Sequence, residues 1–251
     1  MNNSNKVVSS GKSSRWEQAQ HYESNWWNSF ADDYDPSYLE DFASSIREKV
    51  SIVRDINEGN SIIEVGCGPV GIVPFLPCKH NIATDPLNDI FEKHSKYVNF
   101  RKSARNKGTE YLTAKGEALP FEDGEFDFYI TDNVLDHVDS PEDLLNEALR
   151  VLKPGGVAYI RLNVYHPWGR LVRSLMEIAV VDKGHPYTFS SHSLEAMVKK
   201  AGFVVKWSNR SSYLSNWKKD WFRAFNGSLK ALIQALLFVT RARHELIVQR
   251  K

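Results

Sequence analysis

The stretch IIEVGCGPVG, residues 62–71, joins a short apolar run to a loop that contains three glycines. The apolar run predicts a buried strand, and a helix near 70–76 is expected to follow the loop. Glycine lets the backbone turn tightly and lets a ligand approach the main chain. Asp85 follows at the end of the next predicted strand, where a carboxylate can accept hydrogen bonds from both ribose hydroxyls. The spacing therefore predicts an adenosine-type ligand at the carboxyl ends of the strands.

From Ser61 onward, short apolar runs alternate with helical patterns, which predicts an α/β fold with a doubly wound, Rossmann-like sheet and helices on both faces. The clearest helix begins after Ser140, a capping residue followed by proline, and ends at a Lys-Pro-Gly-Gly sequence. The expected strands are 61–65, 81–84, 110–114, 126–131, 157–162, 203–207 and 245–250, and the expected helices lie near 36–56, 70–76, 87–95, 141–152 and 192–201.

The chain is expected to form one domain over residues 15–251, after a polar, disordered tail at 1–14. Residues 15–60 are interpreted as an N-terminal lid and helix, and residues 61–162 as the ligand-binding core. Two stretches, 163–191 and 208–243, fit no simple strand–helix step and are interpreted as insertions that cap the core.

Composition excludes several classes of protein. The 251 residues include 32 Lys and Arg against 31 Asp and Glu, and the net charge of +1 argues against a nucleic-acid partner. Only Cys67 and Cys78 are present, which excludes a disulfide scaffold and a four-cysteine zinc site. No apolar run reaches the roughly 18 residues of a membrane span, and the N-terminus lacks the apolar stretch of a secretory signal. A soluble, cytoplasmic protein is expected.

The charge beside the glycine loop indicates the type of ligand. Glu64 stands two positions before Gly66. We expect its carboxylate to lie near the ligand, where it would repel a pyrophosphate and suit a cationic or amino group. This electrostatic argument favours a sulfonium ligand over NAD.

Four sequence blocks resemble the class I S-adenosylmethionine-dependent methyltransferases, in the small-molecule subgroup that includes ubiquinone-biosynthesis-type enzymes. In chain order they are IIEVGCGPVG (62–71), ATDPL (83–87), GEALPFEDGEFDFYITDNVLDHV (116–138) and LRVLKPGG (149–156). The resemblance implies S-adenosyl-L-methionine as the cofactor and a seven-stranded, mostly parallel sheet whose last strand is antiparallel. Methyl transfer from a sulfonium needs no metal, and none is expected.

The resemblance also implies roles for individual residues. The methionine and ribose part of the cofactor should contact the loop from Glu64 through Gly66, Cys67 and Gly68. Asp85 should hold the ribose hydroxyls. The adenine should lie against Pro86, Leu87, Glu117 and Ala118, and the sulfonium should lie beside Asp132, Asn133 and Val134.

A hydroxyl acceptor needs a base to take its proton, and two histidines are candidates. His137 follows the fourth predicted strand, where the active site of the family opens; the alternative is a histidine that bonds to backbone at a helix start. His185, next to Tyr187, precedes the helix 192–201 and could contact the substrate, or could be a loop residue without a role. Asp136 could orient His137, although adjacent residues seldom bond in this way.

Aromatic residues near the N-terminus suggest a lid over the cofactor and acceptor, or alternatively a packing surface for the N-terminal helix. The candidates are Trp16, Tyr22 and Trp26. Residues 217–243 combine aromatic and basic residues with an apolar run. They could contact a membrane or a lipid-linked acceptor, or instead form a lid helix or a homodimer contact.

The favoured hypothesis is methyl transfer to a small-molecule acceptor, a hydroxyl on a sugar, a glycolipid or a ring compound. An NAD-dependent oxidoreductase or epimerase is an alternative, but the sequence shows no obvious second domain for a substrate after the predicted sheet. A non-catalytic, cofactor-binding partner of another subunit is a second alternative.

Overall fold

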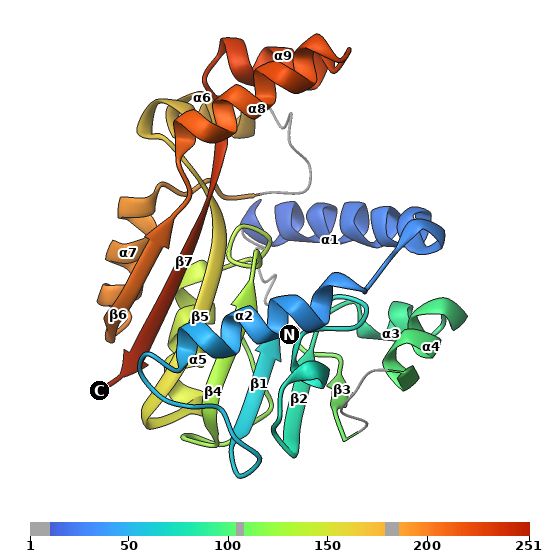
Figure 1. Cartoon of the computed structure of the whole chain (residues 1–251), viewed down its shortest axis with the longest axis vertical. Helices are drawn as coiled ribbons and strands as arrows, with labels where there is room; N and C mark the ends of the chain where they lie inside the picture. The colour runs from blue at the N-terminus through green and yellow to red at the C-terminus, as the bar shows by residue number, and fades with distance from the viewer. Residues whose placement is uncertain (1–10, 104–107, 179–185) are drawn as a thin grey trace, which may run out of the picture.

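The computed structural model describes residues 11–103, 108–178 and 186–251. Its centre is a seven-stranded sheet in the order β3-β2-β1-β4-β5-β7-β6 (Figure 1). The strands are β1 (Ser61–Val65), β2 (His80–Thr84), β3 (Glu110–Leu112), β4 (Phe126–Asp132), β5 (Leu152–Tyr165), β6 (Phe203–Arg210) and β7 (Arg241–Arg250). All seven expected strands are present, although β5 and β7 extend well beyond the predicted ends.

The pairing confirms the fold class. Strands β1 to β5 pair in parallel, and β7 lies antiparallel between β5 and β6. The order reverses between β1 and β4, so that the loops after these two strands diverge. A crevice at the carboxyl ends of the strands is therefore expected at this point.

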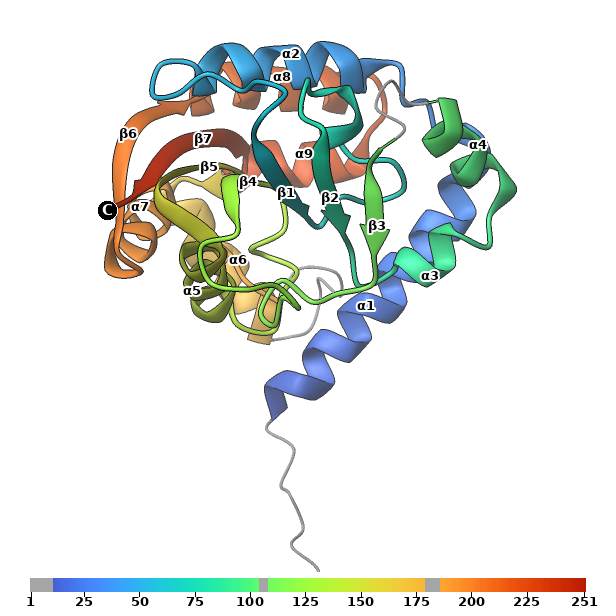
Figure 2. The same ribbon diagram turned by 90° about the horizontal axis from the view of Figure 1, so that it is seen from below.

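Helices cover both faces of the sheet, as Figure 2 shows for α2 on one face and for α5 and α7 on the other. The helices are α1 (Gly11–Phe30), α2 (Tyr38–Val50), α3 (Asn88–Phe91), α4 (Ser95–Ser103), α5 (Pro141–Val151), α6 (Pro167–Ile178), α7 (Ser191–Lys200), α8 (Tyr213–Phe225) and α9 (Leu229–Leu236). Two 3-10 turns, η1 (Ala31–Asp33) and η2 (Val73–Phe75), complete the set.

Three sequence predictions need correction. The helix expected near 70–76 is only the 3-10 turn η2, where Pro74 lacks the N–H that a longer helix would use. The helix expected at 87–95 ends at Phe91, and α4 begins at Ser95. Residues 11–14, expected in a disordered tail, form the first turn of α1; residues 1–10 of that tail lie outside the described residues.

The strands are buried on both sides because each face has its own core. Adjacent residues such as Ile62 and Ile63 point to opposite faces. One face packs against the apolar side of α5, formed by Leu144, Leu145, Ala148 and Val151. The other face packs against the apolar side of α2, formed by Leu39, Ala43, Ile46 and Val50. This double burial holds the strand ends in fixed positions under the site.

The two insertions of the sequence form a helical cap at one end of the molecule. Helix α6 follows β5, and α8 and α9 separate β6 from β7; Figure 1 shows the three helices together beyond the carboxyl ends of the strands. Helix α1 crosses the same side of the sheet, between the strand ends and this cap (Figure 1).

Candidate functional site

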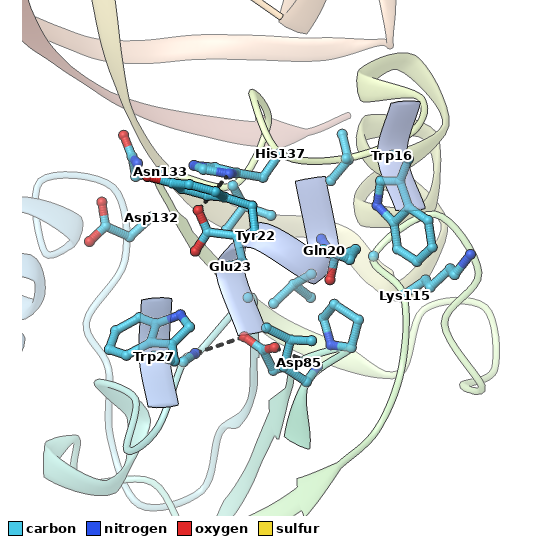
Figure 3. Close-up of a pocket in the computed structure, with 18 of the residues that line it drawn as sticks. Trp16, Gln20, Tyr22, Glu23, Trp27, Asp85, Lys115, Asp132, Asn133 and His137 are labelled. Carbon is cyan, nitrogen blue, oxygen red and sulfur yellow. Dashed lines mark hydrogen bonds and ion pairs between the residues drawn. The ribbon is translucent and has the colours of Figure 1, made fainter. Parts of the chain in front are cut away.

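A cavity of about 620 Å³ lies at the carboxyl ends of the strands, beneath α1. Figure 3 shows side chains of α1 entering it from one side and the loops after the strands from the other. Its lining comprises Trp16, Gln20, Tyr22, Glu23, Trp26, Trp27, Val65, Gly66, Gly68, Asp85, Pro86, Leu87, Lys115, Gly116, Glu117, Asp132, Asn133, Val134, His137, Val138, Lys230 and Arg241. The structure thus brings most of the sequence-predicted site residues to one place.

The glycine loop passes very close to the loop after β4. Gly66 has φ +74°, and a Cβ at this position would lie 2.3 Å from Cγ2 of Val134. A side chain is therefore excluded at Gly66 both by the backbone conformation and by lack of space. Gly68, with φ +62°, is open enough for a ligand to reach its main chain, and its N–H donates to Asp85 at 2.9 Å.

Glu64 differs from the prediction, since it does not line the cavity. Its carboxylate lies behind the glycine loop and accepts hydrogen bonds from the N–H groups of Ile72 (2.7 Å) and Val73 (3.0 Å). Burial raises the pKa of Glu64 to about 8, against the effect of these two N–H groups. The role of Glu64 in this structure is to hold the loop, so its charge no longer discriminates between a sulfonium and a pyrophosphate.

Asp85 lies where the sequence predicted it, on the cavity wall at the end of β2. Its carboxylate is 8% exposed and accepts hydrogen bonds from the N–H groups of Gly68 and Leu87, one at each oxygen. Burial raises the pKa of this carboxyl above its ordinary value, while the two N–H groups oppose the shift. Each oxygen keeps a lone pair for a further donor, as two ribose hydroxyls would require.

The segment after β3 forms another part of the wall. Glu117 lines the cavity, and its Oε1 accepts hydrogen bonds from the N–H groups of Asp139 (2.7 Å) and Ser140 (3.4 Å). Ala118 is exposed and lies outside the lining, unlike the prediction. The Lys115 ammonium lies 3.6 Å from the centroid of the Trp16 ring and joins this segment to α1.

The end of β4 is fixed by two side-chain pairs with β5. Asp132 forms a bidentate ion pair with Arg161, its neighbour in the parallel register. Asn133 adopts φ +57° and accepts a hydrogen bond of 2.6 Å from the Asn163 side chain. These pairs hold the loop that carries Val134 against the glycine loop.

His137 lies on the cavity wall between two carboxylates. Its Nδ1 is 3.5 Å from Oε1 of Glu23 on α1, and its Nε2 is 3.7 Å from Oδ1 of Asp136 (Figure 3). The ring is 17% exposed, and a ligand in the cavity can reach it. The sequence analysis did not find Glu23, because nothing in the pattern of α1 indicates which of its acids turns toward the sheet.

The aromatic residues of α1 divide between packing against the core and lining the cavity, and a lid role for the second group stays a prediction. Trp27 packs edge-on against Phe91 and Tyr97 and so joins α1 to the core. Trp16, together with the half-exposed Tyr22 and Trp26, lines the cavity as a lid would.

Three further predicted residues lie away from the cavity lining or outside the described chain. Tyr187 donates a hydrogen bond from its hydroxyl to the Asp139 carbonyl. Cys67 lies beside the loop with its thiol directed to the Gly68 carbonyl. His185 belongs to residues 179–185, which lie outside the described residues.

Two basic residues of the insertions reach the cavity and were missed by the sequence analysis. Lys230 comes from α9 and Arg241 from the start of β7. Their place in the lining could not be read from the sequence, because the path of the 208–243 insertion was unknown.

Comparison with known proteins agrees with this arrangement. Residues 63–160 match a family model described as "Methyltransferase domain". This part of the chain is a methyltransferase domain. The matched range runs from β1 to β5 and includes the glycine loop, Asp85 and His137. The resemblance to class I S-adenosylmethionine-dependent methyltransferases is thereby confirmed.

Individual relatives match this chain over part of their own length. An uncharacterized protein of Methanocaldococcus jannaschii is 31% identical over 132 residues, which cover 53% of this chain and 58% of that protein. A sterol 24-C-methyltransferase of Pneumocystis carinii is 25% identical over 204 residues, 77% of this chain and 52% of that protein. The chain therefore spans less than two thirds of the length of these relatives.

Solved structures share the fold. A putative methyltransferase of Bacillus halodurans gives a TM-score of 0.59 at 17% identity, covering 82% of this chain and 99% of that chain. A geranyl diphosphate C-methyltransferase of Streptomyces coelicolor gives 0.62 at 15% identity, covering 83% and 79% respectively.

Proposed function

We propose that the protein transfers a methyl group from S-adenosyl-L-methionine to a small-molecule acceptor, at a hydroxyl oxygen. The observation that carries this proposal is the meeting of Asp85, the open main chain at Gly68 and His137 in one cavity of a methyltransferase domain. The glycine loop and Asp85 provide the cofactor half of the cavity, and His137 provides a base in the other half.

The residues present fit this cofactor. A buried carboxylate with free lone pairs suits a pair of ribose hydroxyls, and Gly68 leaves room that a side chain would occupy. Pro86 and Leu87 present apolar surface next to Asp85 for a flat ring. Glu117 could accept a hydrogen bond from an amino group at the far end of that ring.

The cofactor supplies an electrophilic methyl group on a sulfonium, so the protein needs to position the acceptor and exclude water. A hydroxyl acceptor also needs to lose a proton, and His137, which lines the cavity, is the candidate base. Glu23 on α1 lies 3.5 Å from Nδ1 of the imidazole, and its proposed role is to orient the ring, as a carboxylate does for a histidine in other proton-transfer sites. The aromatic side chains of α1 cover the cavity and limit the entry of water.

The acceptor is proposed to be bulky, with a sugar or lipid-linked sugar preferred over a ring compound. Trp26 and Tyr22 offer flat surfaces that can stack on a sugar or ring. Lys230 and Arg241 suit an acceptor that also carries a phosphate or carboxylate. A homodimer and a cytoplasmic location stay predictions from the sequence.

Two alternatives differ in what they bind. An NAD-dependent oxidoreductase would bind NADH and show enhanced nicotinamide fluorescence. A non-catalytic partner subunit would bind the cofactor without turnover. Neither gains support from a specific contact in the cavity.

The test is methyl transfer from radiolabelled S-adenosylmethionine into an extract of cells that lack the gene. We expect label to enter a small molecule that mass spectrometry identifies as one methyl group heavier. Label transfer should fall about a hundredfold with His137→Ala protein that still binds S-adenosylhomocysteine. Cofactor binding without any labelled product, across polar and lipid fractions, would favour the partner-subunit alternative.

A further inference from the structure

The helical cap exposes an unusual amount of apolar surface. Fourteen large apolar side chains are exposed in the described part of the chain, and ten of these lie on α6, α8 and α9 or at the end of α9. Phe225 is 83% exposed and Leu229 is 69% exposed. The ten are Trp168, Leu171, Leu175, Leu214, Phe222, Phe225, Leu229, Ile233, Leu236 and Leu237.

On α6 and α9 these residues are three or four positions apart, and on α8 they are eight and three positions apart. Such spacings place them on one side of each helix. The clearest case is α9, where Ala231 and Ala235 are buried while Leu229, Ile233 and Leu236 are exposed. A helix of a water-exposed surface normally has the reverse arrangement, with its large apolar residues inside. The outer side of α9 is therefore suited to an apolar partner.

The three helices form one unit rather than separate flaps. The Trp217 indole N–H of α8 donates to the Ala235 carbonyl at 2.8 Å, and the Trp168 indole N–H of α6 donates to the Leu237 carbonyl at 3.1 Å. An apolar partner on one helix would thus be in reach of its neighbours (Figure 1). Contiguous exposed apolar surface of this kind marks interaction sites.

The charge of the cap identifies the partner. Residues 213–243 contain six Lys and Arg and one acid, so this segment carries +5 while the rest of the chain carries −4. The single acid, Asp220, is buried and bonds to Thr240. Lys218, Lys219 and Lys230 are exposed, and none of the three forms an ion pair with the described residues. Apolar residues beside unpaired cations match the interface of an anionic lipid bilayer.

We propose that α6, α8 and α9 bind to the surface of an anionic phospholipid membrane, with the apolar residues in the interface and the cations on the lipid phosphates. A second copy of the chain fits less well, because two such caps would bring segments of the same positive charge together. Within the described residues no helix is long and apolar enough to cross the bilayer, so the contact is peripheral. Lys230 also lines the cavity, which places the cavity mouth next to the lipid surface.

The test is co-sedimentation of the full chain with two kinds of vesicle. One is phosphatidylcholine alone, and the other is phosphatidylcholine with about 30% of the anionic lipid phosphatidylglycerol. We expect binding to the anionic vesicles only, weakened at least tenfold when the ionic strength rises to about 0.5 M. Phe222→Ser/Phe225→Ser and Lys218→Glu/Lys219→Glu should each weaken binding at least tenfold. The matched controls are Ile52→Ser, at an exposed apolar residue beyond α2, and Lys199→Glu/Lys200→Glu on α7.

All four variants change exposed side chains, and the far-ultraviolet circular dichroism spectrum shows whether each remains folded. This membrane contact does not depend on the proposed methyl transfer, so loss of one leaves the other standing. Absence of sedimentation with anionic vesicles would overturn it, as would equal losses in the control variants. A dimer in solution that Phe222→Ser/Phe225→Ser dissociates would also overturn it, since the cap would then cover a second copy of the chain.

Discussion

Oε1 of Glu23 lies 3.5 Å from Nδ1 of His137, which joins the lid helix α1 to the loop after β4. The two residues are far apart in the sequence, and α1 is not part of the sheet. We expect the position of α1 to affect the orientation of the candidate base, since Glu23 is the residue of α1 that approaches the ring.

The first prediction concerns this pair. His137→Ala should reduce methyl transfer about a hundredfold, because the hydroxyl proton then has no acceptor. Glu23→Gln should reduce it about tenfold and change the pH profile of kcat, since the amide can still contact the ring without its charge. Glu17→Gln, at an exposed position of α1, is the control. Unchanged rates in both His137→Ala and Glu23→Gln would remove the base assignment without affecting cofactor binding.

The second prediction separates strain from lack of space in the glycine loop. Gly66→Ala places a Cβ 2.3 Å from Val134 at φ +74° and should cost about 3 kcal/mol of unfolding free energy in urea. Gly155→Ala, at φ +75° with no neighbour within 4 Å, should cost only about 1 kcal/mol. Adding Val134→Ala to Gly66→Ala should recover part of the loss. Equal losses at the two glycines would show that the close approach to Val134 has no energetic weight.

The sequence predicted the sheet well because strand signals are local. Apolar runs such as 61–65 and 126–131 are buried on both faces, and their composition alone identifies them. The glycine loop and Asp85 were predicted for the same reason, since a strand end fixes where its next residue lies. The helix expected at 70–76 is wrong because Pro74 has no N–H to donate within a helix, and because the N–H groups of Ile72 and Val73 donate to the Glu64 carboxylate instead.

Features that depend on tertiary placement could not be predicted. Glu64 was expected at the ligand, yet its side chain points to the back of the loop. The cavity is also lined by Glu23, Lys230 and Arg241, because α1 and the cap fold over it. The paths of these two segments do not follow from residue patterns. A residue far from the sheet in sequence thus enters the site without any local signal.

The third prediction concerns Asp127, at the amino end of β4, remote from the cavity. Its carboxylate accepts hydrogen bonds from Ser61 N–H, Arg54 and Lys153, at 3.0, 2.7 and 2.9 Å. Burial alone would raise the pKa of Asp127, but these donors hold it well below its ordinary value. Asp127→Asn should therefore lower the free energy of unfolding by about 3 kcal/mol at pH 7.

The pH dependence gives Asp127 a specific signature. Its stabilisation is present above the unfolded pKa of about 4 and is lost as the pH falls toward the lower folded value. Urea unfolding should show a larger loss for the unmodified protein than for Asp127→Asn between about pH 5 and pH 2. Parallel curves over this interval would contradict the assignment.

The fourth prediction concerns Glu64 and has the opposite sign. Its pKa is raised to about 8, so the unfolded chain releases the proton at a lower pH than the folded chain does. The contribution of Glu64 to the free energy of unfolding is fully present below about pH 4. It declines by up to about 1.4 kcal/mol per pH unit as the pH rises to about 8. Glu64→Gln removes this decline and keeps an oxygen for Ile72 N–H. If the pH slope of stability is the same in both proteins, the buried carboxylate is not the cause.

The central claim is that Asp85 and the glycine loop hold S-adenosylmethionine, and titration calorimetry with S-adenosylhomocysteine tests it most directly. The account predicts saturable binding to the full chain, weakened about thirtyfold, or about 2 kcal/mol, by Asp85→Asn and unchanged by Asp143→Asn in the exposed first turn of α5. Absence of heat with folded protein, or equal affinity in Asp85→Asn, would contradict it.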